Sequence, residues 1–231
     1  MTRPKAIEIL LRIGWLSLLP KQVQKNLLDV SEIRNSPAKS LLYSLEDPPG
    51  GLYGIVDGFV DVLAAPGPFQ MRLVHVAGPG WWTGEAAAVS RGGRRVEVHT
   101  RTNATTIYIP APNLERLGER DPAIWRQLAT LTVRHLDLTM LYAASFASTD
   151  LVLRLLMALM RTIGPSIELG GTFSLPMGQA DLAELTGLSR NTVSRLLAKL
   201  SDEGCVERHY ASLTVNASCL KKLIQERVST P

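Results

Sequence analysis

Between Gln179 and Leu200 the chain places a small residue, a glycine and a branched apolar residue at the spacing of two short helices joined by a tight turn. Ala183 is small enough for the two helices to touch, Gly187 can form the turn, and Val193 returns an apolar side chain to the core. The spacing predicts a helix-turn-helix, which commits this end of the chain to a small helical core.

The second helix of this unit is predicted to have one apolar and one polar face. Ser189 can cap it by accepting a hydrogen bond from an amide of the first turn. Its apolar face consists of Val193, Leu196, Leu197 and Leu200, at intervals of three and four residues. Its polar face presents Ser189, Arg190, Asn191, Ser194, Arg195 and Lys199, with cations and no acid.

This polar face has the chemistry of a DNA reader. The forked side chains of arginine and asparagine match the edges of guanine and adenine in the major groove, whereas serine and lysine suit phosphates. We expect Arg190 to read a base and Arg195 to contact a base or a phosphate. The alternative is an ordinary basic surface helix, but the capped helix-turn-helix spacing favours double-stranded DNA as the partner.

Upstream, from about Ser31 to Pro110, the pattern is that of a β-rich domain. Short runs of β-branched and aromatic residues alternate with clusters of glycine and proline, which is typical of an antiparallel β-barrel or sandwich. The runs are Leu52–Val56, Phe59–Leu63, Met71–Val76, Arg95–Thr100 and Thr106–Ile109. The first thirty residues have helical spacing.

A long helical pattern follows the β-rich domain. Its apolar and aromatic residues repeat at steps of three and four, as Ile124, Leu128, Leu131, His135, Leu138 and Tyr142. A helix with one such stripe needs a partner, so we expect the helix from about Pro122 to Ser148 to hold a homodimer. Two recognition helices would then lie about one DNA turn apart on a pseudo-palindromic operator.

The chain therefore divides into three parts. Residues 1–112 form N-terminal helices and the β-barrel, 113–148 the long dimerisation helix, and 149–231 a winged helix-turn-helix. The wing is predicted from Cys205–Arg208 and Leu213–Val215, two short segments that flank a polar tip. The fold class is α+β.

The composition limits the classes of protein to which the chain can belong. With 45% apolar and 20% charged residues, the 231-residue chain can bury a sizeable core. The apolar stretch Ile7–Leu19 contains Glu8 and Arg12, so we expect neither a membrane segment nor a signal peptide. Cys205 and Cys219 match neither a CxxC nor a metal-ligand spacing, which predicts plain thiols in a reducing compartment, the cytoplasm, and no metal site.

An enzyme is the main competing class. The glycine-rich stretch Gly78–Gly84 lacks the lysine of a phosphate-binding loop and does not match the dinucleotide fingerprint. No GxSxG or HExxH motif is present, and no cysteine and histidine stand at a catalytic spacing. We therefore expect a chain without catalytic activity.

At Asp181–Arg195 the sequence resembles the DNA-binding element of the cyclic-AMP receptor protein and fumarate–nitrate regulator (CRP/FNR) superfamily of bacterial transcription regulators. Gly51–Val62 is similar to the barrel strands of that family, Gly78–Glu85 to its PGDxxGE segment, and Arg154-Leu155 to its helix after the hinge. The resemblance covers about residues 20 to 225. It implies a cyclic-nucleotide-binding-like barrel, a sequence-specific DNA-binding regulator and RNA polymerase as a further partner.

The resemblance also implies an effector pocket inside the barrel. In the cyclic-nucleotide-binding members, a Gly-Glu pair at a short helix holds ribose and phosphate, and a later arginine pairs with the phosphate. The matching residues here are Gly84, Glu85, Arg94, Arg95 and Thr139. The helix N-terminus beside Gly84 is expected to help cradle an anion.

Several residues depart from the family pattern. Arg95 stands where a small polar residue is usual, Thr139 keeps half of a Thr-Ser pair, and Trp81 replaces an aspartate. Asn191 replaces a glutamate of the recognition helix and prefers adenine to cytosine. The effector is therefore left open between a cyclic nucleotide, another small molecule and none.

The cysteines and histidines of the chain limit which other sensor groups it could hold. An iron–sulfur cluster is excluded because residues 1–204 contain no cysteine. His75 and His99 fit strand positions better than haem ligation, and His135 fits a hydrogen-bonded interface residue. The alternative functions are a cyclic-nucleotide-binding module that acts through protein contacts and an effector-independent DNA-binding regulator.

Overall fold

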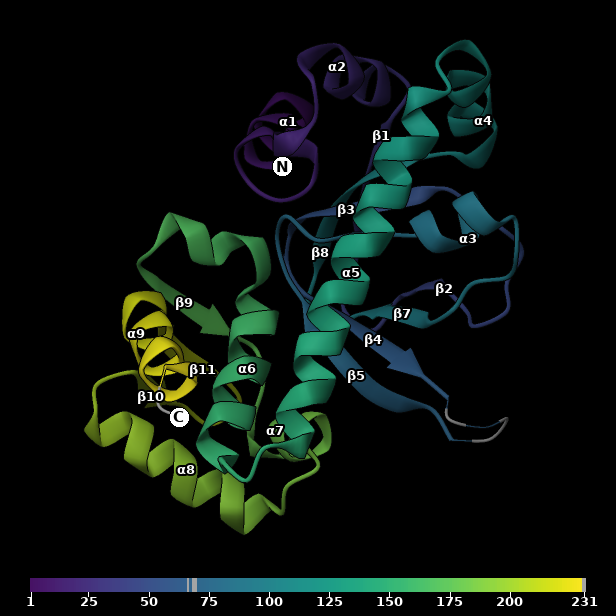
Figure 1. Cartoon of the computed structure of the whole chain (residues 1–231). Coiled ribbons are helices and arrows are strands. Elements are labelled where there is room, and N and C mark those ends of the chain that lie inside the picture. Colours follow the sequence, from purple (N-terminus) through teal and green to yellow (C-terminus); the bar gives the residue numbers. More distant parts are fainter. Residues whose placement is uncertain (66, 68–69, 230–231) are drawn as a thin grey trace.

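The computed structural model describes residues 1–65, 67 and 70–229. A β-barrel with helices on one side forms the N-terminal part, a long helix crosses it, and a smaller helical domain lies at the other end (Figure 1). The first helices are α1 (Arg3–Arg12), the 3-10 turn η1 (Leu16–Leu18) and α2 (Lys21–Asp29). They pack their apolar faces on the barrel, as the helical spacing of the first thirty residues predicts.

The barrel consists of two four-stranded antiparallel sheets, with strand orders β1-β8-β3-β6 and β2-β7-β4-β5. Its strands are β1 (Glu32–Ser36), β2 (Leu41–Tyr43), β3 (Leu52–Asp57), β4 (Val60–Ala64), β5 (Arg72–Ala77), β6 (Trp82–Thr83), β7 (Glu97–Thr100) and β8 (Ala104–Ile109). The short helix α3 (Glu85–Ser90) joins β6 to β7. A Cβ atom at Gly54 would lie 2.6 Å from the Trp82 indole, so glycine allows this close packing inside the barrel.

The segment predicted as one long helix contains two helices, α4 (Ala111–Arg120) and α5 (Ala123–Ala147). The break falls at Asp121-Pro122, because proline has no amide hydrogen to continue a helix. Figure 1 shows α5 running across the barrel to the C-terminal domain.

The prediction of which face of α5 is free for a dimer needs correction. Ile124, Leu128 and Leu131 are buried against the N-terminal helices and the barrel of their own chain, and Tyr142 is buried in the C-terminal core. The period predicts the buried face of α5 correctly at these four positions, which the N-terminal helices, the barrel and the C-terminal core cover, whereas Leu138 of the same stripe is 44% exposed. A second stripe on the opposite side of α5 stays exposed and consists of Val133, Leu136, Met140 and Leu141.

The C-terminal domain is a winged helix-turn-helix. Its elements are α6 (Leu151–Ile163), η2 (Gly164–Leu169), β9 (Thr172–Leu175), α7 (Gln179–Thr186), α8 (Arg190–Asp202), β10 (Val206–Arg208), β11 (Leu213–Asn216) and α9 (Ala217–Val228). Asp150 caps α6 by accepting from the amides of Val152 and Leu153 at 2.9 and 3.1 Å. The α+β fold class is confirmed, and no helix within residues 1–65, 67 and 70–229 could span a membrane.

Candidate DNA-binding surface and effector pocket

The recognition helix α8 begins and packs as its sequence predicts. Gly187 ends α7 with a φ of +66°, a backbone conformation that favours glycine. Ser189 then caps α8, its hydroxyl accepting from the amide of Thr192 at 3.1 Å. Val193, Leu197 and Leu200 are completely buried, which fixes the face that α8 turns outward.

The outward face of α8 carries unpaired cations. Arg190, Asn191, Arg195 and Lys199 are exposed and Ser194 is half-buried. Within the described part of the chain, no carboxylate lies within 4.0 Å of the three cations Arg190, Arg195 and Lys199. Ser189 differs from the other predicted contacts, because the cap already uses its hydroxyl. The face can therefore offer five side chains to a nucleic acid. None of the ion pairs among the described residues would have to break for these contacts to form.

Inside the barrel, Arg94 is a buried cation with spare hydrogen-bond donors. Its side chain is 4% exposed, Nη2 donates to the Gly51 carbonyl at 2.9 Å, and the guanidinium lies 4.2 Å from the Tyr43 ring centre. Its Nε and Nη1 are buried without a partner among the described residues. The guanidinium also lies against Gly84, where a Cβ would come within 2.4 Å of Nη1. These donors are the chemistry that an anion requires.

Glu85 lies beside this arginine but has a partner of its own. The carboxylate is 5% exposed, and its Oε1 is 2.9 Å from Nδ1 of His135 on α5. The Trp81 ring lies 5.8 Å from both the His135 and the His75 rings. His135 was predicted to be a hydrogen-bonded interface residue, but its partner could not be named from sequence.

Burial sets the protonation of two further groups in the barrel. It raises the pKa of the Tyr43 phenol well above its ordinary value, so this residue stays neutral and hydrogen-bonds the hydroxyl of Thr83. Burial, together with the electrostatic influence of Arg161 and His135, lowers the pKa of His75 well below its ordinary value.

The structure does not bring every predicted effector residue to Arg94. Arg95 is exposed and its Nη2 lies 3.4 Å from the Ser90 hydroxyl, on the outer side of α3. Thr139 is also exposed, and its hydroxyl donates to the His135 carbonyl at 2.7 Å. Gly84 and Arg94 are in contact and Glu85 follows Gly84, whereas Tyr43 and the carbonyl of Gly51 were not predicted to contact Arg94.

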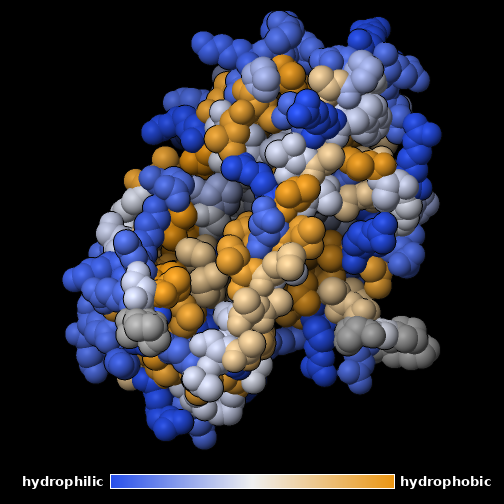
Figure 2. Space-filling view, viewed as in Figure 1, coloured by the Kyte–Doolittle hydropathy of each residue, from blue (hydrophilic) through white to orange (hydrophobic). Residues whose placement is uncertain are grey.

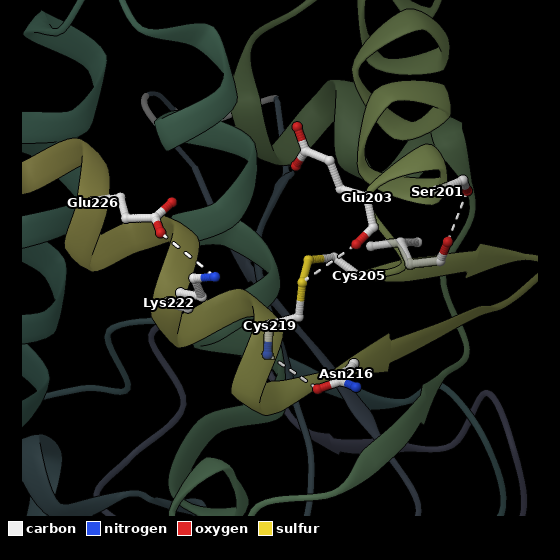
Figure 3. The surroundings of a disulfide bond; sticks show 8 residues. Ser201, Glu203, Cys205, Asn216, Cys219, Lys222 and Glu226 are labelled. Carbon is white, nitrogen blue, oxygen red and sulfur yellow. Dashed lines mark hydrogen bonds and ion pairs between the residues drawn. A yellow bond between two sulfur atoms is a disulfide. The ribbon is translucent and has the colours of Figure 1, made fainter.

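The cysteines correct the prediction of plain thiols. Cys205 and Cys219 form a disulfide, with Cα atoms 5.3 Å apart (Figure 3). Cys205 follows the turn at the end of α8, and Cys219 lies in the first turn of α9. The wing strands β10 and β11 lie between the two cysteines and fold back on each other, which brings Cys205 close to Cys219. The spacing of the cysteines in the sequence does not reveal this contact. The bond ties the end of the recognition helix to α9.

Reduction of this bond should destabilise the C-terminal domain. A cross-link that closes a loop of this length contributes about 3 kcal/mol to the free energy of unfolding. Denaturant unfolding with and without a thiol reductant measures the difference, and the double variant Cys205→Ala/Cys219→Ala should not respond to the reductant. Identical curves for the parent protein in both conditions would mean that the sulfurs are not bonded in solution.

Both halves of the chain match models of known protein families. Residues 33–121 match the family model of the cyclic nucleotide-binding domain, and residues 152–223 match the Crp-like helix-turn-helix domain. The "Probable transcriptional regulator flp" of Lacticaseibacillus casei is 30% identical over 140 residues, which are 59% of this chain and 62% of that protein. The cAMP-activated global transcriptional regulator CRP of Haemophilus influenzae is 24% identical over 182 residues, 78% of this chain and 81% of that one.

Solved structures show the same fold. FixK2 from Bradyrhizobium japonicum superimposes with a TM-score of 0.70 at 19% identity, over 84% of this chain and 97% of that one. The c-di-GMP responsive global regulator CLP of Xanthomonas campestris gives a TM-score of 0.62 at 22% identity, over 85% and 99%. At these identities the likeness concerns the arrangement of the barrel, the long helix and the helix-turn-helix.

Proposed function

This chain belongs to the CRP/FNR superfamily and is a DNA-binding transcription regulator, and on that premise we propose that it works as a homodimer whose two α8 helices read a pseudo-palindromic operator under the control of an anionic effector. The observation that carries the proposal is the outward face of α8, a capped helix with three cations that have no ion pair among the described residues. The chain would act in the cytoplasm, as a regulator and not as an enzyme, with RNA polymerase as a further partner.

The exposed stripe on α5 supports the homodimer. Leu136, Met140 and Leu141 are each more than half exposed, and Figure 2 shows apolar residues along this helix. A contiguous apolar surface of this kind is typical of a protein interface. A groove of about 400 Å³ between α3 and α5 continues the stripe and is lined by Ala86, Val89, Ser90, Arg95, Ala129, Thr132 and Val133. The α5 helix of a second copy carries the same apolar stripe and could therefore cover this surface.

Arg94 supports an effector with an anionic group. A buried cation with two free donors is costly unless something pairs with it, and a phosphate or carboxylate would satisfy both donors at once. Glu85 would accept from a hydroxyl of the same molecule while its Oε1 keeps the contact with His135, because a carboxylate can accept several hydrogen bonds. Because His135 is on α5, this contact would connect the pocket to the dimer helix.

Arg94→Met should make the effector-free protein more stable and abolish anion binding. The substitution removes two buried unpaired donors, which is worth about 1–3 kcal/mol and exceeds the loss of one hydrogen bond to Gly51. Denaturant unfolding measures the stability, and calorimetry with cyclic AMP and cyclic GMP up to about 1 mM measures binding. A destabilised variant would show that Arg94 is a structural residue. Absence of heat from the parent with both nucleotides would exclude cyclic nucleotides as the effector.

Selection of bound duplexes from a random DNA pool, with and without cell extract, tests the whole proposal. We expect an operator with two-fold symmetry and an affinity that falls steeply with salt, because phosphate neutralisation releases counterions. An extract-dependent change would report the effector. Failure to enrich any sequence would favour a module that acts through protein contacts alone.

A further inference from the structure

Arg101 uses every nitrogen of its guanidinium, and two of the three connect the barrel to the helix-turn-helix domain. The residue lies in the turn between β7 and β8, and its side chain is 16% exposed. Nε donates to Asp61 on β4 at 2.5 Å, Nη2 to Asp181 on α7 at 2.9 Å, and Nη1 to the Pro176 carbonyl just before α7 at 2.9 Å. One barrel residue thus holds two points at the start of α7.

The carboxylate that Arg101 grips is also the one that begins α7. The other oxygen of Asp181 accepts from the amide of Gly178 at 2.8 Å, which closes the first turn of the helix. Burial alone would raise the pKa of Asp181, but the hydrogen bonds from Arg101 and Gly178 outweigh it and the pKa lies below its ordinary value. For Asp61 burial outweighs Arg101, and the pKa is raised. Asp181 is therefore favoured in its ionised form, whereas burial works against ionisation of Asp61.

Two further contacts hold the same helix. The Glu184 carboxylate accepts from the amide of Leu73 on β5 at 3.0 Å, and the Tyr142 hydroxyl on α5 donates to the Leu185 carbonyl. The barrel and α5 thus both hold α7. In contrast, the polar face of α8 has no contact of this kind among the described residues, so the docking leaves the DNA-reading side chains free.

Because α7 and α8 share one core, the orientation of α7 sets that of α8. Leu182, Leu185, Val193 and Leu197 are buried together, and only the turn at Gly187 separates the helices. Apolar contacts of β5 with this domain are non-directional and allow sliding, whereas a forked guanidinium with fixed partners is directional. Arg101 is therefore a contact that can define an angle, and it is the one that holds α7 at two points.

We propose that Arg101 is a positioning residue for DNA binding, which fixes the orientation of α8 relative to the barrel so that both half-sites are read at once. The inference depends on the proposed dimeric operator complex. A dimer that holds its two α8 helices at the correct separation binds its second half-site as an intramolecular event. Release of α7 would remove this advantage and leave each α8 intact.

The test is Arg101→Met, assayed on the operator selected with the parent protein and on a duplex that carries one half-site. We expect the affinity for the full operator to fall about tenfold or more, with the half-site affinity unchanged. Arg101→Lys should restore part of the loss, since it keeps the charge but not the fork. The matched control is Arg72→Met on neighbouring β5, whose guanidinium reaches only Gln70 among the described residues, at 3.5 Å.

A second measurement needs no DNA. Hydrogen exchange at the amide of Leu73 and along α7 should be faster in Arg101→Met than in the parent, with the other amides of the barrel strands unchanged. Glu184→Ala, which removes a different contact of α7, should produce the same loss on the full operator without touching Arg101. Equal losses on full and half-sites, or unchanged exchange in α7, would overturn the positioning role. Failure of the parent to select any operator would instead count against the proposed function.

Discussion

Replacing Arg190 by alanine should weaken operator binding by about 1–3 kcal/mol for each half-site and relax specificity at one position of each. Arg190 is the first residue of α8. Its guanidinium is exposed and has no ion pair among the described residues, so it can contact DNA directly. The N-terminal residues of a recognition helix approach the base edges, where a guanidinium donates two hydrogen bonds to guanine. The loss is therefore one of discrimination as well as affinity.

Titration of labelled operator and of single-base variants of it measures both quantities. Lys199→Ala, at the other end of the same helix, is the contrasting variant. It should weaken all sequences equally and reduce the salt dependence, as expected for a phosphate contact. If the double variant Arg190→Ala/Arg195→Ala bound as tightly as the parent, the outward face of α8 would not be the reading face.

Leu136→Glu on α5 should convert the dimer to a monomer and remove high-affinity operator binding with it. The side chain is 54% exposed in the single chain, so the glutamate is tolerated there. In the dimer, two glutamates would be buried in an apolar interface without partners, which is strongly unfavourable. Loss of the second half-site then removes the gain from bivalent binding.

Light scattering at micromolar concentration measures the mass, and circular dichroism verifies that the variant is folded. Leu18→Glu is the matched control, since this leucine in η1 is 61% exposed and lies outside α5. A dimer that persists in Leu136→Glu would mean that the exposed stripe of α5 is not the interface. A parent protein that is itself a monomer would contradict the dimer altogether.

The local features of the recognition helix follow from neighbouring residues, and the sequence was sufficient to predict them. The cap at Ser189, the left-handed turn at Gly187 and the buried Val193 depend on hydrogen bonds and spacings within a few residues. The same holds for the barrel strands β3, β4, β5, β7 and β8, which coincide with the predicted runs, whereas β1, β2 and β6 were not predicted. Short-range hydrogen bonding and side-chain period do not change with the rest of the fold.

The partner of each apolar face was decided by the tertiary structure. The period of α5 reveals that one face is apolar, but not whether the barrel or a second copy covers it. Ile124, Leu128 and Leu131 pack on their own barrel, and the opposite stripe, with Val133 and Leu136, remains for a partner.

Long-range pairs were likewise outside the reach of the sequence. Glu85 meets His135, 50 positions away, and Arg101 meets Asp181, 80 positions away. The disulfide between Cys205 and Cys219 forms only because the wing folds back. Each of these contacts depends on the angle at which two elements pack, and that angle is a property of the whole core. The sequence by itself therefore determined the helix-turn-helix and its polar outward face, and the packing of the domains determined what connects that face to the barrel.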